Sequence, residues 1–257
     1  VSGEAERAEG CARLSKQWHE VVKSRWSAQH GALSDAESSG PTSEWTQALA
    51  LYFGLLSVEQ AQSVAELRSQ FDEPIDSWWQ AFFLAGGLWQ HGLGVQARAC
   101  VDRHWGRLLK RPGTSWRARA DTQEIVPGVD ALLARHVLGV YPLGSGNNAV
   151  EVRPQAEEPM QRVSGTIRIG SSALDIEWSL NGAGYLSLIV EQNVEGELHL
   201  SVPRLGKRFP TIALNGETVW RNEKIYPNFH THDVISEAKN VVLVVHKAGR
   251  YHAELSA

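Results

Sequence analysis

Apolar residues recur every three or four positions through the first half of the chain, and glycine or proline falls mainly between these stretches. This spacing gathers apolar side chains on one face of a helix and therefore predicts about six helices. Their expected ranges are 4–27, 43–55, 58–71, 75–91, 95–110 and 129–138. Ser57 and Gln60 predict a capping box at the start of the third helix.

Beyond Tyr141 the hydrophobic period changes to two, as in AVEVRP, GTIRIG and ALDIEWSL. Alternation of this kind predicts strands with one buried face. The pairs Asn181-Gly182 and Asn215-Gly216 are typical of hairpins that need positive φ angles. About seven or eight short strands predict an antiparallel β-sandwich. The expected fold class is α+β, with a helical domain over 1–140 and a β-sandwich domain over 141–257.

Several helices of the first half are apolar almost all round, as in WWQAFFLAGGLWQ. Tryptophan is also concentrated there, at positions 18, 26, 45, 78, 79, 89, 105 and 116. Such helices need cover on more than one side. Either the rings pack against each other and the sheet, or one face meets another chain or a missing part of the same chain. The chain does not begin with Met, as expected for a start inside a longer precursor.

The composition is that of an ordinary globular protein, with 257 residues, 42% hydrophobic and 21% charged residues, and a net charge of −4. Cys11 and Cys100 allow at most one disulfide and no cysteine-based zinc site. The scattered basic residues argue against nucleic acid as a partner, and no stretch reaches the roughly 18 apolar residues of a membrane span. The loop GVYPLGSGNN lacks the lysine and following helix of a phosphate loop, and no cofactor is expected.

The order of several motifs resembles a known family. TSEWTQALALYFGLL, HWGRLLKRPGTSWRARAD and LLARHVLGVYPLGSGNNAVEVRPQ follow one another as in the end of the (α/α)6 barrel of α-L-rhamnosidase-like glycoside hydrolases. SGTIRIGSSALDIEWSL is similar to part of that family's C-terminal β-sandwich. The resemblance runs from about Thr42 to Trp178. It implies the last part of a barrel followed by a sandwich, without the first barrel half and the β-domains that precede it.

The family resemblance implies inverting glycoside hydrolysis, which needs two carboxylates roughly 6.5 to 9.5 Å apart. The general acid of the family belongs to the absent part, and its general base is a Glu after the Trp of a Thr-Thr-x-Trp-Glu segment. Arg117 stands at that base position, and a guanidinium cannot accept a proton. The His-rich turn of the family has no His in 121–128. Asp121 or Glu124 could replace the lost base, or could pair with Arg117 in a polar surface loop.

The segment DEPIDSWW, at 72–79, places acids beside two indoles at the start of a helix. The acids could serve only the helix dipole. They could also accept hydrogen bonds from sugar hydroxyls while the indoles stack on the ring. The predicted substrate-binding residues are Glu73, Asp76, Trp78, Trp79 and Trp116.

His230, His232 and Asp233, with Tyr226 and Asn228 nearby, form the densest histidine cluster in the sequence. Two histidines on one side of a strand could bind a metal, but further ligands at suitable spacing are missing. A polar loop is the preferred interpretation, and no metal site is predicted.

These observations favour the C-terminal portion or subunit of an α-L-rhamnosidase-like hydrolase acting on rhamnose-containing glycosides. The expected partners are a carbohydrate or small molecule and a second polypeptide or upstream part of the same precursor. Arg117 favours an alternative, a catalytically inactive descendant that binds a ligand, and a structural subunit that completes a barrel is the third hypothesis. An extracellular location agrees with the resemblance, although the acidic start lacks the basic and apolar regions of a signal peptide.

Overall fold

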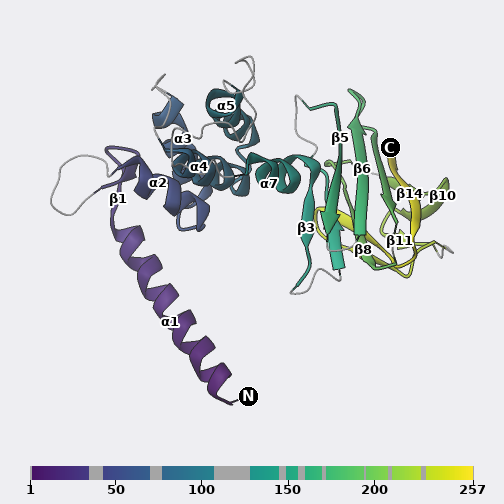
Figure 1. Ribbon diagram of the computed structural model, residues 1–257, viewed down its shortest axis with the longest axis horizontal. Helices are drawn as coiled ribbons and strands as arrows, with labels where there is room; N and C mark the ends of the chain where they lie inside the picture. Colours follow the sequence, from purple (N-terminus) through teal and green to yellow (C-terminus); the bar gives the residue numbers. More distant parts are fainter. Residues whose placement is uncertain are drawn as a thin grey trace, which may run out of the picture. The chain divides into compact units, whose positions relative to one another are not determined.

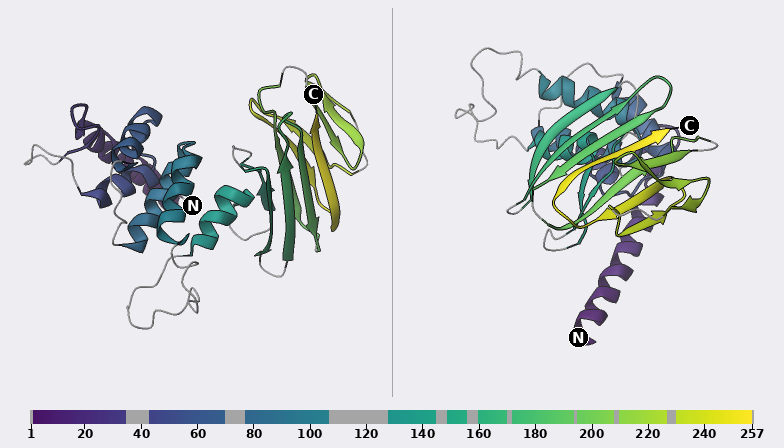
Figure 2. Two further views of the ribbon diagram at one scale, coloured as in Figure 1. Left: turned by 90° about the horizontal axis from the view of Figure 1, so that it is seen from above. Right: turned by 90° about the vertical axis from the view of Figure 1, so that its right-hand side faces the viewer.

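The computed structural model describes residues 2–34, 43–69, 77–106, 128–144, 149–155, 160–169, 172–193, 195–207, 210–226 and 230–256. Its contacts divide the chain into a helical unit, Val1–Val129, and a strand unit, Asp130–Ala257. Figures 1 and 2 show helices in the first and mainly strands in the second. The protein is thus of the α+β class, with its helices in the N-terminal half. No helix in the described ranges is long and apolar enough to cross a membrane.

The helical unit contains five helices and a short hairpin among its described residues. The elements are α1 (Ser2–Ser24), β1 (Trp26–Ser27), β2 (Ala32–Leu33), α2 (Glu44–Tyr52), α3 (Val58–Ser69), α4 (Trp78–Gln90) and α5 (Gly94–His104). The capping box is confirmed: the Ser57 N–H donates to Gln60 Oε1 over 2.9 Å, and the Gln60 N–H donates to Ser57 Oγ over 3.2 Å. The expectation that the first helix reaches position 27 is wrong, because Trp26 and Ser27 pair with β2 instead.

Helices α2 and α4 run parallel and touch along their length. Their beginnings meet where Gln80 Nε2 donates to Glu44 Oε2 over 3.0 Å. Toward their ends, a Cβ at Gly87 would lie only 2.6 Å from the Leu51 Cβ and 2.7 Å from the Tyr52 nitrogen. Because real Cβ atoms essentially never come so close, only glycine allows this approach of the two backbones.

The polar side chain of Gln47 fastens the hairpin to α2. Its Oε1 accepts from the Leu33 N–H over 3.1 Å, and its Nε2 donates to the Leu33 carbonyl over 2.9 Å. Gln47 is 6% exposed, so both halves of its amide are buried with a partner. Leu33 pairs with Trp26 of β1 on one side, and the Gln47 amide takes the place of a strand on the other side.

Helix α7 (Val129–Leu133) starts at the last residue of the helical unit and continues into the strand unit. A π-helical turn, η1 (Ala134–Leu138), follows it. Its strands are β3 (Val140–Pro142), β4 (Ala149–Val152), β5 (Arg162–Ile169), β6 (Ser172–Leu180), β7 (Leu186–Gln192), β8 (Glu197–Pro203), β9 (Thr211–Leu214), β10 (Glu217–Arg221), β11 (Lys224–Ile225), β12 (Asp233–Ser236), β13 (Asn240–Val245) and β14 (Gly249–Ser256).

These strands form two sheets. One has seven strands in the order β11-β10-β9-β14-β7-β6-β5, and the other has five in the order β12-β13-β8-β4-β3. All pairs are antiparallel except β4 with β8, which is parallel. The expectation of a purely antiparallel arrangement is therefore wrong at this one pair.

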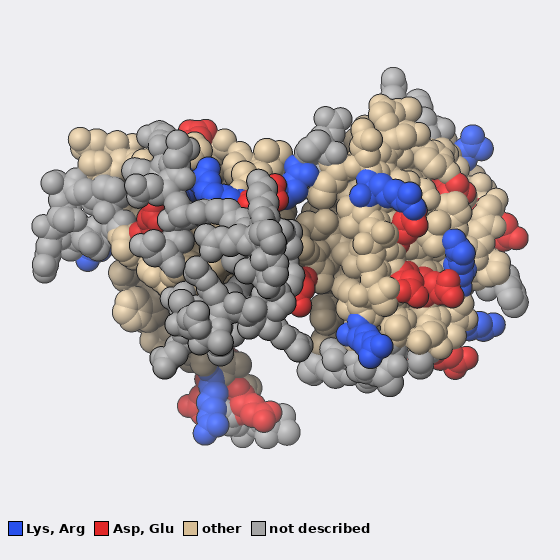
Figure 3. All heavy atoms as spheres, turned by 45° about the horizontal axis from the view of Figure 1, so that its top comes forward, with Lys and Arg blue, Asp and Glu red and all other residues tan. Residues whose placement is uncertain are grey.

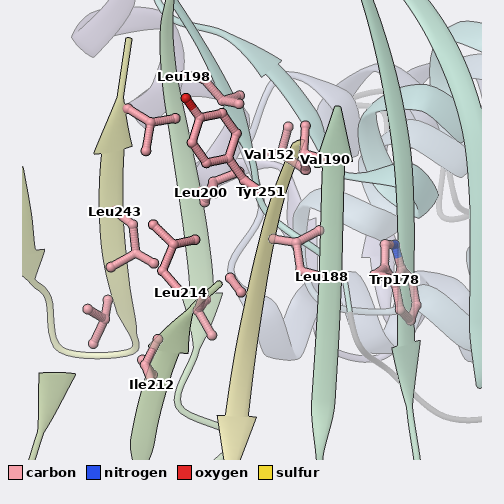
Figure 4. Packing of buried hydrophobic residues seen from close by; sticks show 14 of the residues in the cluster. Val152, Trp178, Leu188, Val190, Leu198, Leu200, Ile212, Leu214, Leu243 and Tyr251 are labelled. Atoms are coloured by element: carbon pink, nitrogen blue, oxygen red, sulfur yellow. The ribbon is translucent and has the colours of Figure 1, made fainter. Parts of the chain in front are cut away.

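One hydrophobic core lies between the two sheets (Figure 4). The seven-stranded sheet contributes Trp178 and Leu188, and the five-stranded sheet contributes Leu200 and Leu243. All four are 0% exposed. Burial of such side chains contributes about 2 kcal/mol each, which makes this core the main source of the unit's stability.

The two predicted glycine turns differ in outcome. Asn215 and Gly216 have φ angles of 50° and 84°, as expected of a hairpin turn. At Asn181-Gly182 the expectation of positive φ is wrong, because Gly184 adopts it instead, with φ 72°. The Asn181 side chain accepts from the N–H groups of Ala183 and Tyr185 and shapes a longer turn.

The turn η1 packs against the sheet that follows it. The Trp178 indole N–H donates to the Val137 carbonyl over 3.2 Å. Gly139 ends the turn with φ 87°, and its N–H donates to the Ala134 carbonyl. His136 is buried at 6% exposure, and burial lowers its pKa to about 4, with a smaller contribution from the Arg135 charge.

Candidate functional site

Most predicted site residues lie outside the described part of the chain. This holds for the predicted base position and its substitutes, Arg117, Asp121 and Glu124, and for Glu73, Asp76 and Trp116. Their roles stay predictions. Trp78 and Trp79 are described, and they lie at the start of α4. In sequence, the segment 70–76 leads into this start, and the segment 107–127 follows the end of α5.

Four helix termini meet at this end. The α2 and α4 beginnings are linked by the hydrogen bond between Glu44 and Gln80. The end of α3 joins them through Arg68, whose Nε lies 3.6 Å from Glu44 Oε1. The end of α5 follows through Trp105, whose ring centroid lies 5.7 Å from that of Trp78. We call this end, with Glu44, Trp45, Arg68, Trp79 and Gln80, the polar end of the helical unit.

Trp78 and Trp79 differ in what they can offer a ligand. Trp78 is half-buried against Trp105, which is 1% exposed, and therefore contributes to packing. Trp79 is 47% exposed, and its ring stacks on Phe83 with centroids 6.2 Å apart and an interplanar angle of 27°. Trp79 is therefore the more exposed of the two rings and can contact a ligand or another segment.

Glu44 and Trp45 were not identified from the sequence. Trp45 is 37% exposed, and its ring lies 6.2 Å from Phe83, so two exposed indoles flank one phenylalanine. The Glu44 carboxylate is half-exposed and lies between the Gln80 amide and the Arg68 guanidinium. Carboxylate, amide and guanidinium groups beside aromatic faces can bind hydroxyl groups of a sugar. The sequence did contain a signal for these two residues: an acid directly followed by an indole in the first turn of a helix. Acids beside indoles at a helix start are also the feature of DEPIDSWW.

An aromatic surface extends from this end along α2 and α4. Tyr52 lies 4.9 Å from Phe83 and 5.5 Å from Phe53, and Phe82 lies 5.7 Å from Phe83, between ring centroids. Phe53, at the far end of α2, is 65% exposed. We call this set the aromatic ridge; its members are Trp45, Tyr52, Phe53, Trp79, Phe82 and Phe83.

The buried cysteine of the helical unit is not a nucleophile. Cys100 and Cys11 are both free. Burial raises the pKa of the Cys100 thiol to about 12, so it stays protonated at neutral pH. His104 Nδ1 lies 2.7 Å from the Cys100 carbonyl oxygen and 3.8 Å from the sulfur, so its shorter contact is to the backbone.

A Ser-His-Glu cluster on the strand unit also lacks catalytic geometry. Ser187 Oγ and Glu254 Oε1 lie 2.8 and 3.7 Å from the same atom, His252 Nε2. A catalytic relay needs the serine and the carboxylate on opposite ring nitrogens. The Tyr185 hydroxyl donates to Glu254, and this bond is the main cause that raises the pKa of Tyr185 to about 12. These side-chain contacts link the neighbouring strands β7 and β14 and are structural.

The histidines near β12 and β13 form a ring contact. The His232 and His246 centroids lie 4.6 Å apart with perpendicular planes. Asn228, which the sequence placed beside them, lies outside the described residues. Among the residues that are described, no group of three His, Cys, Asp or Glu side chains could hold a metal ion.

Charge on the strand unit is mixed. On the face seen in Figure 3, Lys and Arg side chains lie next to Asp and Glu side chains, and neither sign dominates. Arg162 on β5 and Glu177 on β6 form such a pair, 2.9 Å apart. The described side chains of this face form no continuous basic surface of the kind that phosphate backbones require.

No family model and no curated protein matches this chain. Solved structures do match it. α-L-Rhamnosidase from Streptomyces avermitilis, complexed with L-rhamnose, matches 97% of this chain with a TM-score of 0.62 and 15% identity. α-L-Rhamnosidase from Dictyoglumus thermophilum matches 84% with a TM-score of 0.61 and 20% identity. A GH78 family rhamnosidase of Bacillus sp. GL1 matches 74% with a TM-score of 0.54 and 18% identity.

The match covers most of this chain but only part of those enzymes. It spans 24%, 26% and 22% of the Streptomyces, Dictyoglumus and Bacillus chains, respectively. At these identities the likeness concerns the fold. The chain has the fold of about a quarter of a GH78 α-L-rhamnosidase, consistent with the C-terminal part of such an enzyme.

Proposed function

We propose that this chain supplies the C-terminal part of an α-L-rhamnosidase-like glycoside hydrolase that acts on rhamnose-containing glycosides. The observation that carries the proposal is the shared fold, which extends over both units of this chain in the Streptomyces match. In this proposal the helical unit is a portion of an (α/α)6 barrel, and the strand unit is the C-terminal β-sandwich. The remaining helices come from a second polypeptide or from an upstream part of the same precursor.

The polar end of the helical unit is the sugar-contacting part in this proposal. Trp79 offers an exposed ring face, and Glu44 offers a carboxylate that Gln80 and Arg68 hold in place. The segments with Glu73, Asp76 and Trp116 are joined in sequence to the helix termini at this end. The aromatic ridge supports the need for further helices, because three of its rings, those of Trp45, Phe53 and Trp79, are exposed and the other three are only half-buried.

Binding of L-rhamnose to the purified chain tests the proposal. Trp79→Ala should weaken binding by about two- to tenfold, because a stacking face is lost. The matched control is Phe53→Ala, an exposed ring of the same ridge at the far end of α2. Binding can be measured by saturation-transfer NMR and titration calorimetry. Absence of rhamnose binding by the folded chain, or equal losses in both variants, would contradict the assignment of this end.

Arg117 favours a second candidate, a rhamnosidase-derived protein without hydrolytic activity that retains carbohydrate binding. A guanidinium at the base position cannot accept a proton from the attacking water, and in this candidate neither Asp121 nor Glu124 takes over that role. Incubation with an aryl α-L-rhamnoside separates the two candidates. Hydrolysis by the unmodified chain, alone or together with the part that completes the barrel, would rule out the inactive form. Binding without hydrolysis by that completed assembly, even in Arg117→Glu, would support it.

A further inference from the structure

His91 closes the end of α4 with both nitrogens of its ring. Its Nδ1 lies 2.8 Å from the Gly87 carbonyl oxygen, one turn back on the same helix. Its Nε2 lies 3.1 Å from the Leu56 carbonyl oxygen, in the connection between α2 and α3. The half-buried imidazole thus bridges two segments that are 35 positions apart in the sequence.

Both partners of the ring are carbonyl oxygens, which can only accept a hydrogen bond. A neutral imidazole has a single N–H, and the lone pair of its other nitrogen would face the lone pairs of an oxygen. The imidazolium form has an N–H on each nitrogen and can donate to both oxygens. The contacts of His91 therefore match the protonated ring, and they leave the neutral ring only one of the two hydrogen bonds.

The surroundings of His91 favour a positive charge. His91 is the C-cap residue of α4, and the last turn of this helix contains no basic residue. A cation at a helix C-terminus interacts favourably with the helix dipole. Among the described residues, His91 forms no hydrogen bond or ion pair with a charged side chain. No Asp, Glu, Lys or Arg occurs in the segments 45–58 and 77–97, which contain α2, α4 and the connection.

Other titratable side chains lie on the elements around this ring. Those nearest to the two segments in sequence, on α2, α3 and α5, are Tyr52, Glu59 and Arg98. The Glu59 carboxylate accepts from Ser57 Oγ over 2.7 Å, and this bond is the main cause that lowers its pKa. The two carbonyl oxygens and the helix end are therefore the groups that act directly on the charge of His91.

We propose that His91 is a proton-operated latch between the end of α4 and the connection from α2 to α3. In the protonated ring, Nδ1–H donates to the Gly87 carbonyl and Nε2–H donates to the Leu56 carbonyl. At higher pH the ring loses one proton to water, so one of the two bonds breaks and the connection can separate from α4.

The latch acts on the far end of the aromatic ridge. The connection begins at Phe53, the C-cap residue of α2, whose ring is 65% exposed. The rigidity of this part of the ridge therefore depends on pH. The inference is independent of the proposed hydrolase function, because it rests on contacts within the helical unit.

Nitrogen-15 NMR of the imidazole rings in the full chain gives the first test and needs no substitution. At about pH 5, His91 should show two ring N–H signals that exchange slowly with water, because both are bonded to carbonyls. As the pH rises to about 8, one ring nitrogen should acquire the shift of an unprotonated nitrogen. An unprotonated nitrogen at the low pH, free exchange of both protons with water, or retention of both protons throughout would each overturn the proposal.

Hydrogen exchange of two backbone amides tests whether the proton controls the structure. The Leu93 N–H donates to the Leu88 carbonyl over 2.9 Å, next to the end of α4. The Leu55 N–H donates to the Ala50 carbonyl over 2.9 Å, at the start of the connection. After correction for the intrinsic exchange rate at each pH, both sites should open about tenfold more often at about pH 8 than at about pH 5. This factor corresponds to a hydrogen bond that involves a charged group.

Two substitutions separate the latch from other effects of pH. His91→Gln has no titratable ring and should abolish the pH dependence of opening at both amides. The matched control, His19→Gln, removes an imidazole from α1 and should keep it. Circular dichroism checks that both variants fold. Opening that does not change with pH in the native chain, or that changes equally in His91→Gln, would overturn the proposal.

Discussion

Substitution of Gly139 by alanine should destabilise the strand unit severely. Gly139 joins η1 to β3 with φ 87°, and an added Cβ would lie 2.1 Å from the Arg153 carbonyl oxygen and 2.5 Å from its carbon. Both atoms belong to the backbone, so no side chain can move aside. The Arg153 N–H also donates to the Gly139 carbonyl over 2.7 Å, which holds the two segments together. Relief of the clash would break this bond and disturb the pairing of β3 with β4.

The expected cost follows from three contributions. A residue with a Cβ at this φ loses about 1 to 2 kcal/mol. Overpacking against fixed atoms adds about 1 to 3 kcal/mol, and the lost hydrogen bond adds about 1 kcal/mol. The free energy of unfolding should therefore fall by about 3 to 6 kcal/mol, a large part of the stability of an ordinary domain.

Gly144→Ala is the matched control for this prediction. Gly144 has nearly the same φ, 84°, but a Cβ there would meet nothing within 4 Å. It should cost only the conformational contribution of about 1 to 2 kcal/mol. Urea unfolding followed by pulsed hydrogen exchange of β6, β7 and β13 reports the strand unit separately. Equal stability of the two variants would refute the close approach of Gly139 to Arg153.

Three further predictions concern other parts of the chain. Gly87→Ala should lower the free energy of unfolding of the helical unit by about 1 to 3 kcal/mol, because the added Cβ overpacks against α2. Gly10→Ala, with open space around it, should raise this free energy by up to about 1 kcal/mol. Similar melting temperatures of the two variants would contradict the close contact at Gly87. The folded-state pKa of His136 is lowered to about 4. The unfolded chain therefore binds this proton first, and stability should be complete above about pH 6.5 and fall by about 2 kcal/mol as the pH drops through 4. Urea titrations at several pH values should show a flatter profile in His136→Gln, and an unchanged profile would refute the assignment. Iodoacetamide at pH 8 should alkylate Cys11 in the native chain and Cys100 only after unfolding, because burial raises the pKa of the Cys100 thiol to about 12; native labelling of both, seen by mass spectrometry, would contradict this.

Local patterns in the sequence predicted local structure well. Ser57 and Gln60 form the expected capping box, because such a motif needs only residues three positions apart. Asn215 and Gly216 form the expected turn for the same reason. The helices and strands follow from the period of their apolar residues, since burial of one face depends on that period alone.

Features that depend on distant segments could not be predicted. The parallel pairing of β4 with β8 joins strands that other elements separate in the chain. Glu44 and Gln80 are 36 positions apart, so only the packing of α2 on α4 identifies them as neighbours. The difference between Trp78 and Trp79 likewise depends on Trp105 of the α5 terminus, which covers one ring and leaves the other exposed.

The hydrogen bond from the Trp178 indole N–H to the Val137 carbonyl determines where a truncated form of this protein should begin if the strand unit is to be expressed alone. It anchors the last helical turn to a strand more than forty positions later, so that turn belongs with the sheet rather than with the helices before it. A truncated gene that begins at β3 would remove the Val137 carbonyl, which accepts from the Trp178 indole N–H. It would also uncover the ring of Trp178, which is 0% exposed. One that begins at Asp130 keeps both, and should give the more soluble and more cooperatively melting product.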